Sequence, residues 1–294
     1  MANIQLFKIG EKVEEIHGSN VTLESELQQI IEANMRSFFG VTFLASEYPT
    51  THGGRMDSIG IDENYCPVIF EYKRKQNENV INQGLYYLDW LLKHKDSFKV
   101  LVIEKLGLEK AKLIDWSLPR VICIAGDFNK YDESAINQMT KSVSLIRYKL
   151  FNDMLMFEQV GEHLVDTRTL EQGSSKITHK NFDERLTDAS ETIQKLFEKA
   201  KEFILSLGDD ISIANLKYYT AFKKIKNFAS IVLVKSKMIL NLKLDVGTVN
   251  FEAGFSRDVT NLGRWGSGNV EVSIKNDSDF EKVKPLIERA YKEN

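Results

Sequence analysis

The sequence predicts an α/β fold for the first half of the chain, a mixed sheet with helices against it, followed by a smaller α+β unit. Strand-like apolar runs alternate with amphipathic helical stretches up to about residue 160. Residues 161–184 are polar and have no period, which is typical of a linker. The remaining residues have enough chain for a core of their own. We therefore expect one domain at 1–160 and a second at 185–294, joined by the linker 161–184.

The composition is that of a soluble globular protein. Of the 294 residues, 43% are apolar and 28% are charged, and the net charge of -3 does not by itself indicate nucleic-acid binding. Cys66 and Cys123 stand far apart without C-x-x-C spacing, which argues against a disulfide framework or a zinc site and favours a reducing cytoplasm. The N-terminus does not resemble a signal peptide, and no apolar run approaches the roughly 20 residues that a membrane span needs.

Periodicity predicts the elements of the first half. Apolar residues recur at helical spacing over 22–38, where Thr22 can cap the helix and Gly40 follows its end. A second helix is expected over 80–95. The stretches 56–62 and 67–73 are predicted to be two strands of one hairpin. Further strands are expected at 4–9, 41–48, 98–104, 120–126, 143–151 and 154–160, the last two pairing with each other.

The second half is predicted to contain an amphipathic helix over 187–207, a closing helix over 279–292 and several strands. Its most unusual stretch is 255–274, where Arg257, Asp258 and Trp265 lie among several glycines. Arginine and tryptophan suit contact with an anion or a base. The same stretch, which also contains Arg264, would suit a glycine-rich lead into a hairpin with a core tryptophan and a structural pair of an arginine with Asp258, and the sequence leaves both interpretations open. The expected strands are 217–223, 228–234, 237–244 and 268–274.

Three charged residues of the predicted hairpin carry the functional prediction. Side chains alternate along a strand, so Glu71 and Lys73 share a face at the end of the strand 67–73. Asp57 opens the partner strand and lies near that end if the two strands pair. Isolated charges would be costly to bury there, whereas Mg²⁺, which takes carboxylate, water and phosphate oxygens, removes that cost. A metal-activated water beside Lys73 could then attack a phosphodiester.

Neighbouring residues could extend this site. Glu24 lies in the first turn of the first predicted helix and could aim at the same centre, or it could simply favour the helix terminus through the dipole. Glu26 and Glu32 are weaker rivals for that role. Gln83 and Tyr87 share a face of the second helix, either to contact a phosphate and hold the lysine or as packing residues.

Simpler interpretations stand beside each of these. Glu71 and Lys73 could form an ordinary cross-strand ion pair on the surface, and Asp57 could be a turn residue. His52, in a glycine-containing turn, could be a ligand but is more typical of a solvated loop histidine. The basic run from Lys73 to Lys75 could be a solvated face or could meet a phosphate backbone.

The longer string resembles a known nuclease superfamily. Asp57, followed by Glu71-Tyr72-Lys73 after an apolar run, resembles the D…(D/E)-x-K motif of the PD-(D/E)XK nucleases, although no proline precedes the aspartate. Gln83-x-x-x-Tyr87 is similar to the Q-x-x-x-Y element of the RecB-like branch. The order of elements and the wider string, roughly residues 20 to 105, resemble the NucS-like endonucleases.

This resemblance implies a restriction-endonuclease-like core and a Mg²⁺- or Mn²⁺-dependent endonuclease acting on DNA, in repair or in defence against foreign DNA. It implies that Asp57 and Glu71 bind the metal, that Lys73 activates water or stabilises charge, that Glu24 is a further ligand through water, and that Gln83 positions the phosphate or the lysine. Many members of the superfamily pair up to cut two strands, so the resemblance also allows a homodimer. The expected nucleic-acid contacts are Arg55, Arg74, Lys75 and Tyr87.

Two other functions remain open. A nuclease fold could hold nucleic acid without cutting it, or the second half could dominate as a scaffold. Residues 185–294 resemble a small C-terminal domain of unknown function that accompanies nuclease-like domains in proteins labelled "predicted transport protein". Because no stretch of the sequence is predicted to span a membrane, we expect this domain to serve substrate targeting or dimerisation.

Overall fold

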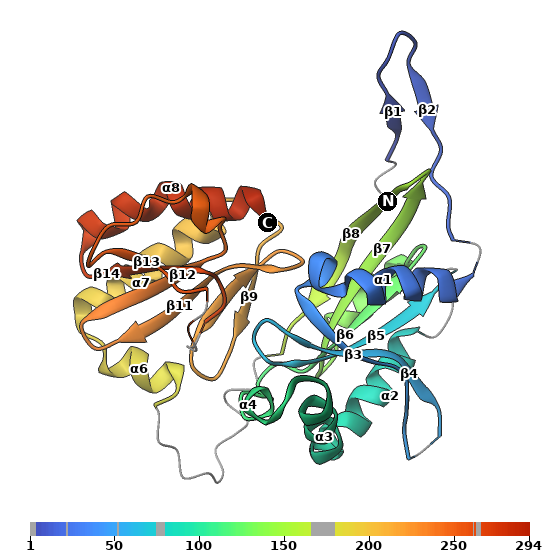
Figure 1. Ribbon diagram of the computed structural model, residues 1–294, viewed down its shortest axis with the longest axis horizontal. Coiled ribbons are helices and arrows are strands. Elements are labelled where there is room, and N and C mark those ends of the chain that lie inside the picture. The colour runs from blue at the N-terminus through green and yellow to red at the C-terminus, as the bar shows by residue number, and fades with distance from the viewer. Residues whose placement is uncertain are drawn as a thin grey trace. The chain divides into compact units, whose positions relative to one another are not determined.

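The computed structural model of the chain describes residues 4–21, 23–51, 53–74, 80–165, 180–260, 262 and 266–294. These residues divide into two units. Unit 1 draws on Met1–Ile114 and Pro119–Val165, and unit 2 draws on Asp115–Leu118 and Asp166–Asn294. Each unit has a six-stranded sheet with helices packed on it (Figure 1).

Unit 1 is built on a mixed sheet with the strand order β3-β4-β5-β6-β7-β8. The central strands β5, β6 and β7 run parallel, and the other neighbouring pairs are antiparallel. Parallel neighbours need a crossover connection, which helices α2 to α4 supply between β5 and β6, and α5 supplies between β6 and β7. The strands are β3 (Val41–Pro49), β4 (Arg55–Asp62), β5 (Pro67–Lys73), β6 (Arg120–Ala125), β7 (Ser142–Phe151) and β8 (Met154–His163).

Helices cover both faces of this sheet. Helix α1 places Phe39 against Phe70 of β5, with ring centroids 5.4 Å apart, and Gly84 of α2 lies so close to Val121 of β6 that a Cβ at the glycine would come within 2.4 Å of the valine. Figure 1 shows α1 and α2 on opposite sides of the sheet. The helices are α1 (Glu24–Phe39), α2 (Val80–Lys93), α3 (Lys95–Leu106), α4 (Leu108–Ala111) and α5 (Lys130–Ile136), and a separate small hairpin pairs β1 (Leu6–Lys8) with β2 (Glu14–Ile16).

One predicted strand of unit 1 is wrong. Residues 98–104 are an apolar run with several β-branched residues, but they lie inside α3. The residues of α3 that are buried are Phe98, Leu101 and Val102, which have helical spacing. Because the run is apolar on every side, its periodicity does not distinguish a buried strand from a helix, and the crossover between two parallel strands requires the helix. The predicted hairpin of β4 and β5, by contrast, is confirmed by their antiparallel pairing.

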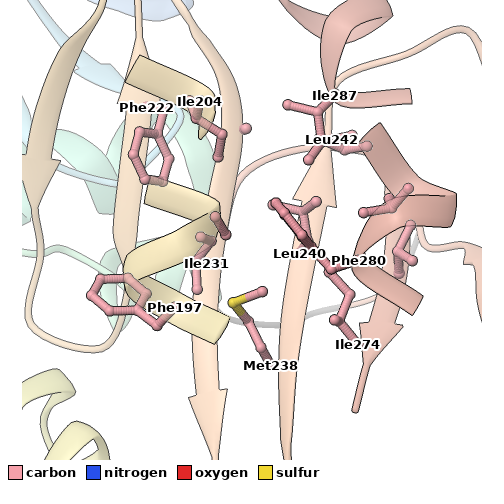
Figure 2. Close-up of a cluster of buried hydrophobic side chains, with 14 of the residues drawn as sticks. Phe197, Ile204, Phe222, Ile231, Met238, Leu240, Leu242, Ile274, Phe280 and Ile287 are labelled. Carbon is pink, nitrogen blue, oxygen red and sulfur yellow. The ribbon is translucent and has the colours of Figure 1, made fainter. Parts of the chain in front are cut away.

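Unit 2 has an antiparallel sheet in the order β13-β14-β12-β11-β10-β9. Figure 2 shows the core between this sheet and two helices: Phe197 and Ile204 of α7 and Phe280 of α8 meet strand residues such as Leu240. The strands are β9 (Ser212–Asn215), β10 (Thr220–Lys223), β11 (Asn227–Val234), β12 (Lys237–Leu242), β13 (Ser256–Asp258) and β14 (Val270–Ile274), and the helices are α6 (Phe182–Asp188), α7 (Glu191–Leu205), η1 (Val246–Thr248) and α8 (Asp277–Glu293).

Several boundaries in this region differ from the prediction. The single helix expected over 187–207 is two helices, because Ala189 is extended and the hydroxyl of Ser190 caps α7 by accepting the N–H of Ile193. Strands β9 and β13 were not predicted. At the two ends of the stretch 161–184, β8 continues to His163 and α6 begins at Phe182, and residues 166–179 lie outside the described part.

In the described part of the glycine-rich stretch of unit 2, Arg257 pairs with a glutamate and not with Asp258, and Arg264 lies outside the described residues. Arg257 pairs with Glu271 of the neighbouring strand, with Nη2 2.7 Å from Oε1, because the antiparallel register sets these two residues opposite each other. Asp258 instead accepts the hydroxyl of Thr260 at 2.6 Å. Trp265 lies outside the described residues. No helix in the described ranges combines the length and apolarity needed to cross a membrane.

Candidate active site

The paired strands β4 and β5 separate at the point where the charged residues lie. Their ladder runs from Ile61–Pro67 to Ser58–Phe70. Beyond it, the carboxylate Oδ2 of Asp57 accepts the main-chain N–H of Tyr72 at 2.9 Å, and the carboxylate Oε1 of Glu71 accepts the main-chain N–H of Asp57 at 3.4 Å. Side-chain acceptors thus replace main-chain carbonyls, and the two acidic groups come together, as the hairpin geometry predicts.

The two carboxylates share an environment that disfavours their charged forms. Glu71 is only 2% exposed. Burial and the neighbouring charge of Asp57 raise the pKa of Glu71 to about 9, against the lowering effects of the Asp57 N–H and Lys73. Burial also raises the pKa of Asp57, although the N–H of Tyr72 and the charge of Lys73 act in the opposite direction. A nearby positive charge would therefore stabilise both acids in their ionised form.

Lys73 closes the same end of β5 and lies beside a third acid. Its side chain is 16% exposed, and its Nζ is 3.5 Å from Oε2 of Glu24. The other oxygen of Glu24 accepts the main-chain N–H of Arg74 at 3.3 Å. The first turn of α1 thereby lies against the end of β5, and the fold brings Glu24 close to Lys73 and Arg74. Its direct contact is with the lysine.

The donor chemistry of this end of the sheet fits a hard divalent cation. In the described residues, no group of three or more His, Cys, Asp and Glu side chains has a metal-binding arrangement. Mg²⁺, however, is commonly held by one or two carboxylates together with water and a phosphate. Asp57 and Glu71 supply such a pair, and their hydrogen bonds to main-chain N–H groups use Oδ2 and Oε1. Their other oxygens, Oδ1 and Oε2, are the atoms that could meet a cation.

Helix α2 and the β3–β4 turn form a wall beside the pair. Tyr87 is 8% exposed, and the charge of Glu71 adds to burial in raising the pKa of its phenol, while a hydrogen bond with the backbone of Arg55 lowers it. Gly54 has a φ of +87°, and a Cβ there would come within 2.7 Å of the tyrosine hydroxyl. The glycine therefore permits both the turn and the close approach of Tyr87.

Three comparisons with known proteins bear on identity. The chain is 31% identical over 283 residues to an uncharacterized protein of Haemophilus influenzae, and the match covers 92% of this chain and 93% of that protein. The chain belongs to the same family. Residues 182–294 match the model of a domain of unknown function, DUF5655. The crystal structure of a repair endonuclease from Pyrococcus abyssi is similar to 46% of this chain and 50% of its own, with 20% identity and a TM-score of 0.30, a likeness too low to establish a shared fold.

The other residues that the sequence predicts for the site do not contact the carboxylate pair in the described contacts. Gln83 is exposed on α2, and no described contact joins it to the carboxylate pair. Arg55 is exposed and pairs with Glu47, its Nε 3.2 Å from the carboxylate. Arg74 is half-buried at the end of β5. Lys75 and His52 lie outside the described residues.

Sequence reasoning missed a second row of polar residues at this site. Gln28 Nε2 donates to the main-chain carbonyl of Asp57 at 2.9 Å, and Ser58 Oγ donates to Glu32 at 2.6 Å. The two alternatives to Glu24 thus have other contacts. Glu32 bonds to β4 through Ser58, and Glu26 accepts the N–H of Leu23 at the start of the helix. The signal was present in the sequence, because residues 24, 28 and 32 recur every four positions and so lie on one face of a helix.

Proposed function

We propose that unit 1 is a Mg²⁺- or Mn²⁺-dependent endonuclease that hydrolyses phosphodiester bonds in DNA. The observation that carries this proposal is the pair of the half-buried Asp57 and the buried Glu71, whose carboxylates lie at the diverging end of two strands with Lys73 on the same strand end. Both acids have raised pKa values. A structural ion pair has no use for two acids that disfavour each other's charge, whereas one divalent cation can be held by both.

The residues have distinct roles in this proposal. Asp57 and Glu71 hold the cation, which when bound polarises the phosphodiester and makes a water more acidic. Lys73 holds the negative charge that develops on the phosphate, as preorganised cationic groups do in a partly dry site. Glu24 keeps the lysine at the end of β5 through its contact at 3.5 Å, so it acts as a positioning residue, with coordination through water as an additional role.

DNA contacts follow from the surroundings of the carboxylate pair. Arg55 is exposed on β4 two residues before Asp57, and Arg74 and Lys75 continue the chain after Lys73. These residues would meet the phosphate backbone, which contributes affinity that falls with salt. Tyr87 would line the site, and Gln83, which is exposed on the first turn of α2, would contact the phosphate. A role in DNA repair or in defence, and a homodimer that cuts both strands, rest on the sequence resemblance.

The proposal is tested with labelled single-stranded, branched and duplex DNA and Mn²⁺. We expect wild-type protein to cut at least one substrate, and Lys73→Ala to lower the rate about 100-fold to 1000-fold because a charge-stabilising group is lost. Lys93→Ala is the matched control, since that lysine is exposed and pairs only within α2 in the described contacts. Equal cleavage by wild type and Lys73→Ala would reject the assignment, and no cleavage by either would reject the enzyme.

A second candidate function is a protein that holds nucleic acid without cutting it. The contact of Lys73 with Glu24 favours it, because an acid-paired lysine contributes less charge to a phosphate. DNA binding with steep salt dependence but without cleavage would support this alternative.

The scaffold alternative, in which unit 2 carries the function, has its own test. When the residues after 165 are deleted, a nuclease should keep part of its cleavage, whereas a scaffold that depends on unit 2 should lose its partner.

A further inference from the structure

A row of polar residues on α1 contacts β4 and the end of β5, the two strands that carry the carboxylate pair. The helix packs on the face of the sheet opposite to Glu71. Glu24, Gln28 and Glu32 lie on one face of the helix. Glu24 contacts the end of β5. Gln28 and Glu32 contact β4 at two successive residues, Asp57 through its main-chain carbonyl and Ser58 through its hydroxyl. The row therefore follows the strands along the site.

The hydrogen bonds of this row continue into β5. Tyr72 is 1% exposed, and its hydroxyl donates to Ser58 Oγ at 3.0 Å. Ser58 in turn donates to Glu32 Oε1, which also accepts Gln28 Nε2 at 2.9 Å. One continuous path of hydrogen bonds thus joins β5, β4 and α1, and it begins at the residue whose main-chain N–H is bonded to the Asp57 carboxylate.

The chemistry of Gln28 fixes its orientation. Its Nε2 lies 2.9 Å from Glu32 Oε1, from Ser46 Oγ and from the carbonyl of Asp57. Carboxylate and carbonyl oxygens only accept, so the amide nitrogen must face them, and its two hydrogens can serve two of these oxygens at a time. A glutamate at this position would have the same shape but would bring an acceptor against acceptors.

We infer that Gln28, with Glu32, Ser58 and Tyr72, forms a positioning network that holds the diverging ends of β4 and β5 at the separation at which the carboxylates of Asp57 and Glu71 each bond to the opposite strand. The strand ladder stops at Ser58–Phe70, so main-chain pairing does not set that separation. Alternation of side chains leaves Ser58 and Tyr72 on the face opposite to Asp57 and Glu71. The side chains of the network thus lie behind the site, and they contact Asp57 only at its main-chain carbonyl. Only its link to cation binding rests on the proposed nuclease function.

The direct test is hydrogen exchange of the main-chain amides of Asp57 and Tyr72 in metal-free protein, compared between wild type and Gln28→Glu. We expect exchange at both amides to become about tenfold faster or more, because the strand ends lose a restraint of roughly one hydrogen bond, while the amide of Ile122 in the central strand β6 stays protected. Gln29→Ala, an exposed neighbour on the same helix, should change neither. Unchanged exchange at Asp57 and Tyr72 would overturn the inference. Equal acceleration at Ile122 would also contradict it, because Gln28 would then stabilise the whole unit and not the strand ends in particular.

A second variant guards against a folding defect. Tyr72→Phe removes one hydroxyl from the network without a change in size, and it should accelerate exchange of the same two amides.

The double variant Gln28→Glu with Glu32→Gln restores a donor–acceptor pair between the two helix residues but not a donor to the Asp57 carbonyl. It should recover thermal stability while the Asp57 and Tyr72 amides still exchange fast. Recovery of their protection would assign the effect to the helix pair and contradict the inference.

Cation affinity provides a separate arm, measured by calorimetry with Mn²⁺ alone. Loss of an outer-shell partner typically costs about 10-fold to 100-fold in metal affinity, and we expect a loss in that range for Gln28→Glu. If wild-type protein binds no Mn²⁺ and cuts no DNA, the proposed nuclease fails, but the exchange data still decide the network. If Mn²⁺ binds equally to wild type and Gln28→Glu despite faster exchange, the network positions strands without setting the cation site.

Discussion

The carboxylate of Glu71 accepts the main-chain N–H of Asp57, and 3.4 Å separates the two atoms. Asp57 makes the reciprocal type of bond to the residue after Glu71, accepting the N–H of Tyr72. Each acid is thereby tied to the opposite strand, and the two carboxyl groups are held close where the strand ladder has ended. This arrangement costs free energy in the absence of a cation, and several measurable consequences follow from it.

The first prediction concerns the pH dependence of stability without metal. The folded-state pKa of Glu71 is raised to about 9, above the unfolded value of about 4.3, so the folded state retains a proton that the unfolded state has lost. The free energy of unfolding should therefore fall as pH rises from about 5 to 9. Glu71→Gln should flatten this fall, and at pH 8 the metal-free variant should be more stable than wild type. Urea unfolding across this pH range, with the exposed Glu109→Gln as control, measures the effect.

The second prediction concerns metal addition. A cation that binds only the folded state stabilises it by about 2.7 kcal/mol at 100 times its dissociation constant. Mn²⁺ should raise the melting temperature of wild-type protein, and a chelator should reverse the rise. The double variant Asp57→Asn with Glu71→Gln should show no shift, because the oxygens that could hold the ion lose their charge. A shift of equal size in this variant would place the cation elsewhere.

The third prediction uses two adjacent glycines as matched sites. Gly53 and Gly54 have φ values of +84° and +87°, but only at Gly54 would a Cβ meet another atom, the hydroxyl of Tyr87. Gly53→Ala should cost about 1 kcal/mol through backbone strain alone, and Gly54→Ala should cost more. Adding Tyr87→Phe to Gly54→Ala should recover part of the loss. Thermal unfolding of wild type, the two single glycine variants and the double variant tests this. Equal losses of stability at the two glycines would contradict the prediction.

The fourth prediction concerns the buried ion pair of Arg120 with Asp62. Both side chains are almost fully buried, 5% and 3% exposed, and Asp62 Oδ1 also accepts the N–H groups of Asn64 and Cys66. Asp62→Asn keeps an acceptor for these two groups but leaves the Arg120 charge unpaired, so it should destabilise unit 1 by about 3–5 kcal/mol.

The matched control for this pair is Glu109→Gln, which removes the exposed partner of Lys112 and should cost no more than about 1 kcal/mol. Urea unfolding of both variants gives the comparison. A cost of similar size in the two would mean that burial does not govern the Asp62 pair.

The local parts of the candidate site could be predicted from the sequence because they depend on short-range geometry. The two-residue alternation of a strand places Glu71 with Lys73, and a short turn between 62 and 67 sets Asp57 beside them. Helix α2 was likewise predictable from its apolar period, and so was the face that carries Tyr87. The buried pairing of Asp62 with Arg120, 58 residues away, was not predictable from local pattern.

The sequence by itself determined the main amphipathic helices and the hairpin that joins Asp57 to Glu71, since each of these is fixed by residues a few positions apart. Only the tertiary structure decided that 98–104 is helical, that Glu24 lies against Lys73 across 49 positions, and that Gln28 reaches the carbonyl of Asp57. The physical reason is that these outcomes depend on which surface each element packs against. A glutamine on a helix face has the same local pattern whether it meets water or the back of a site.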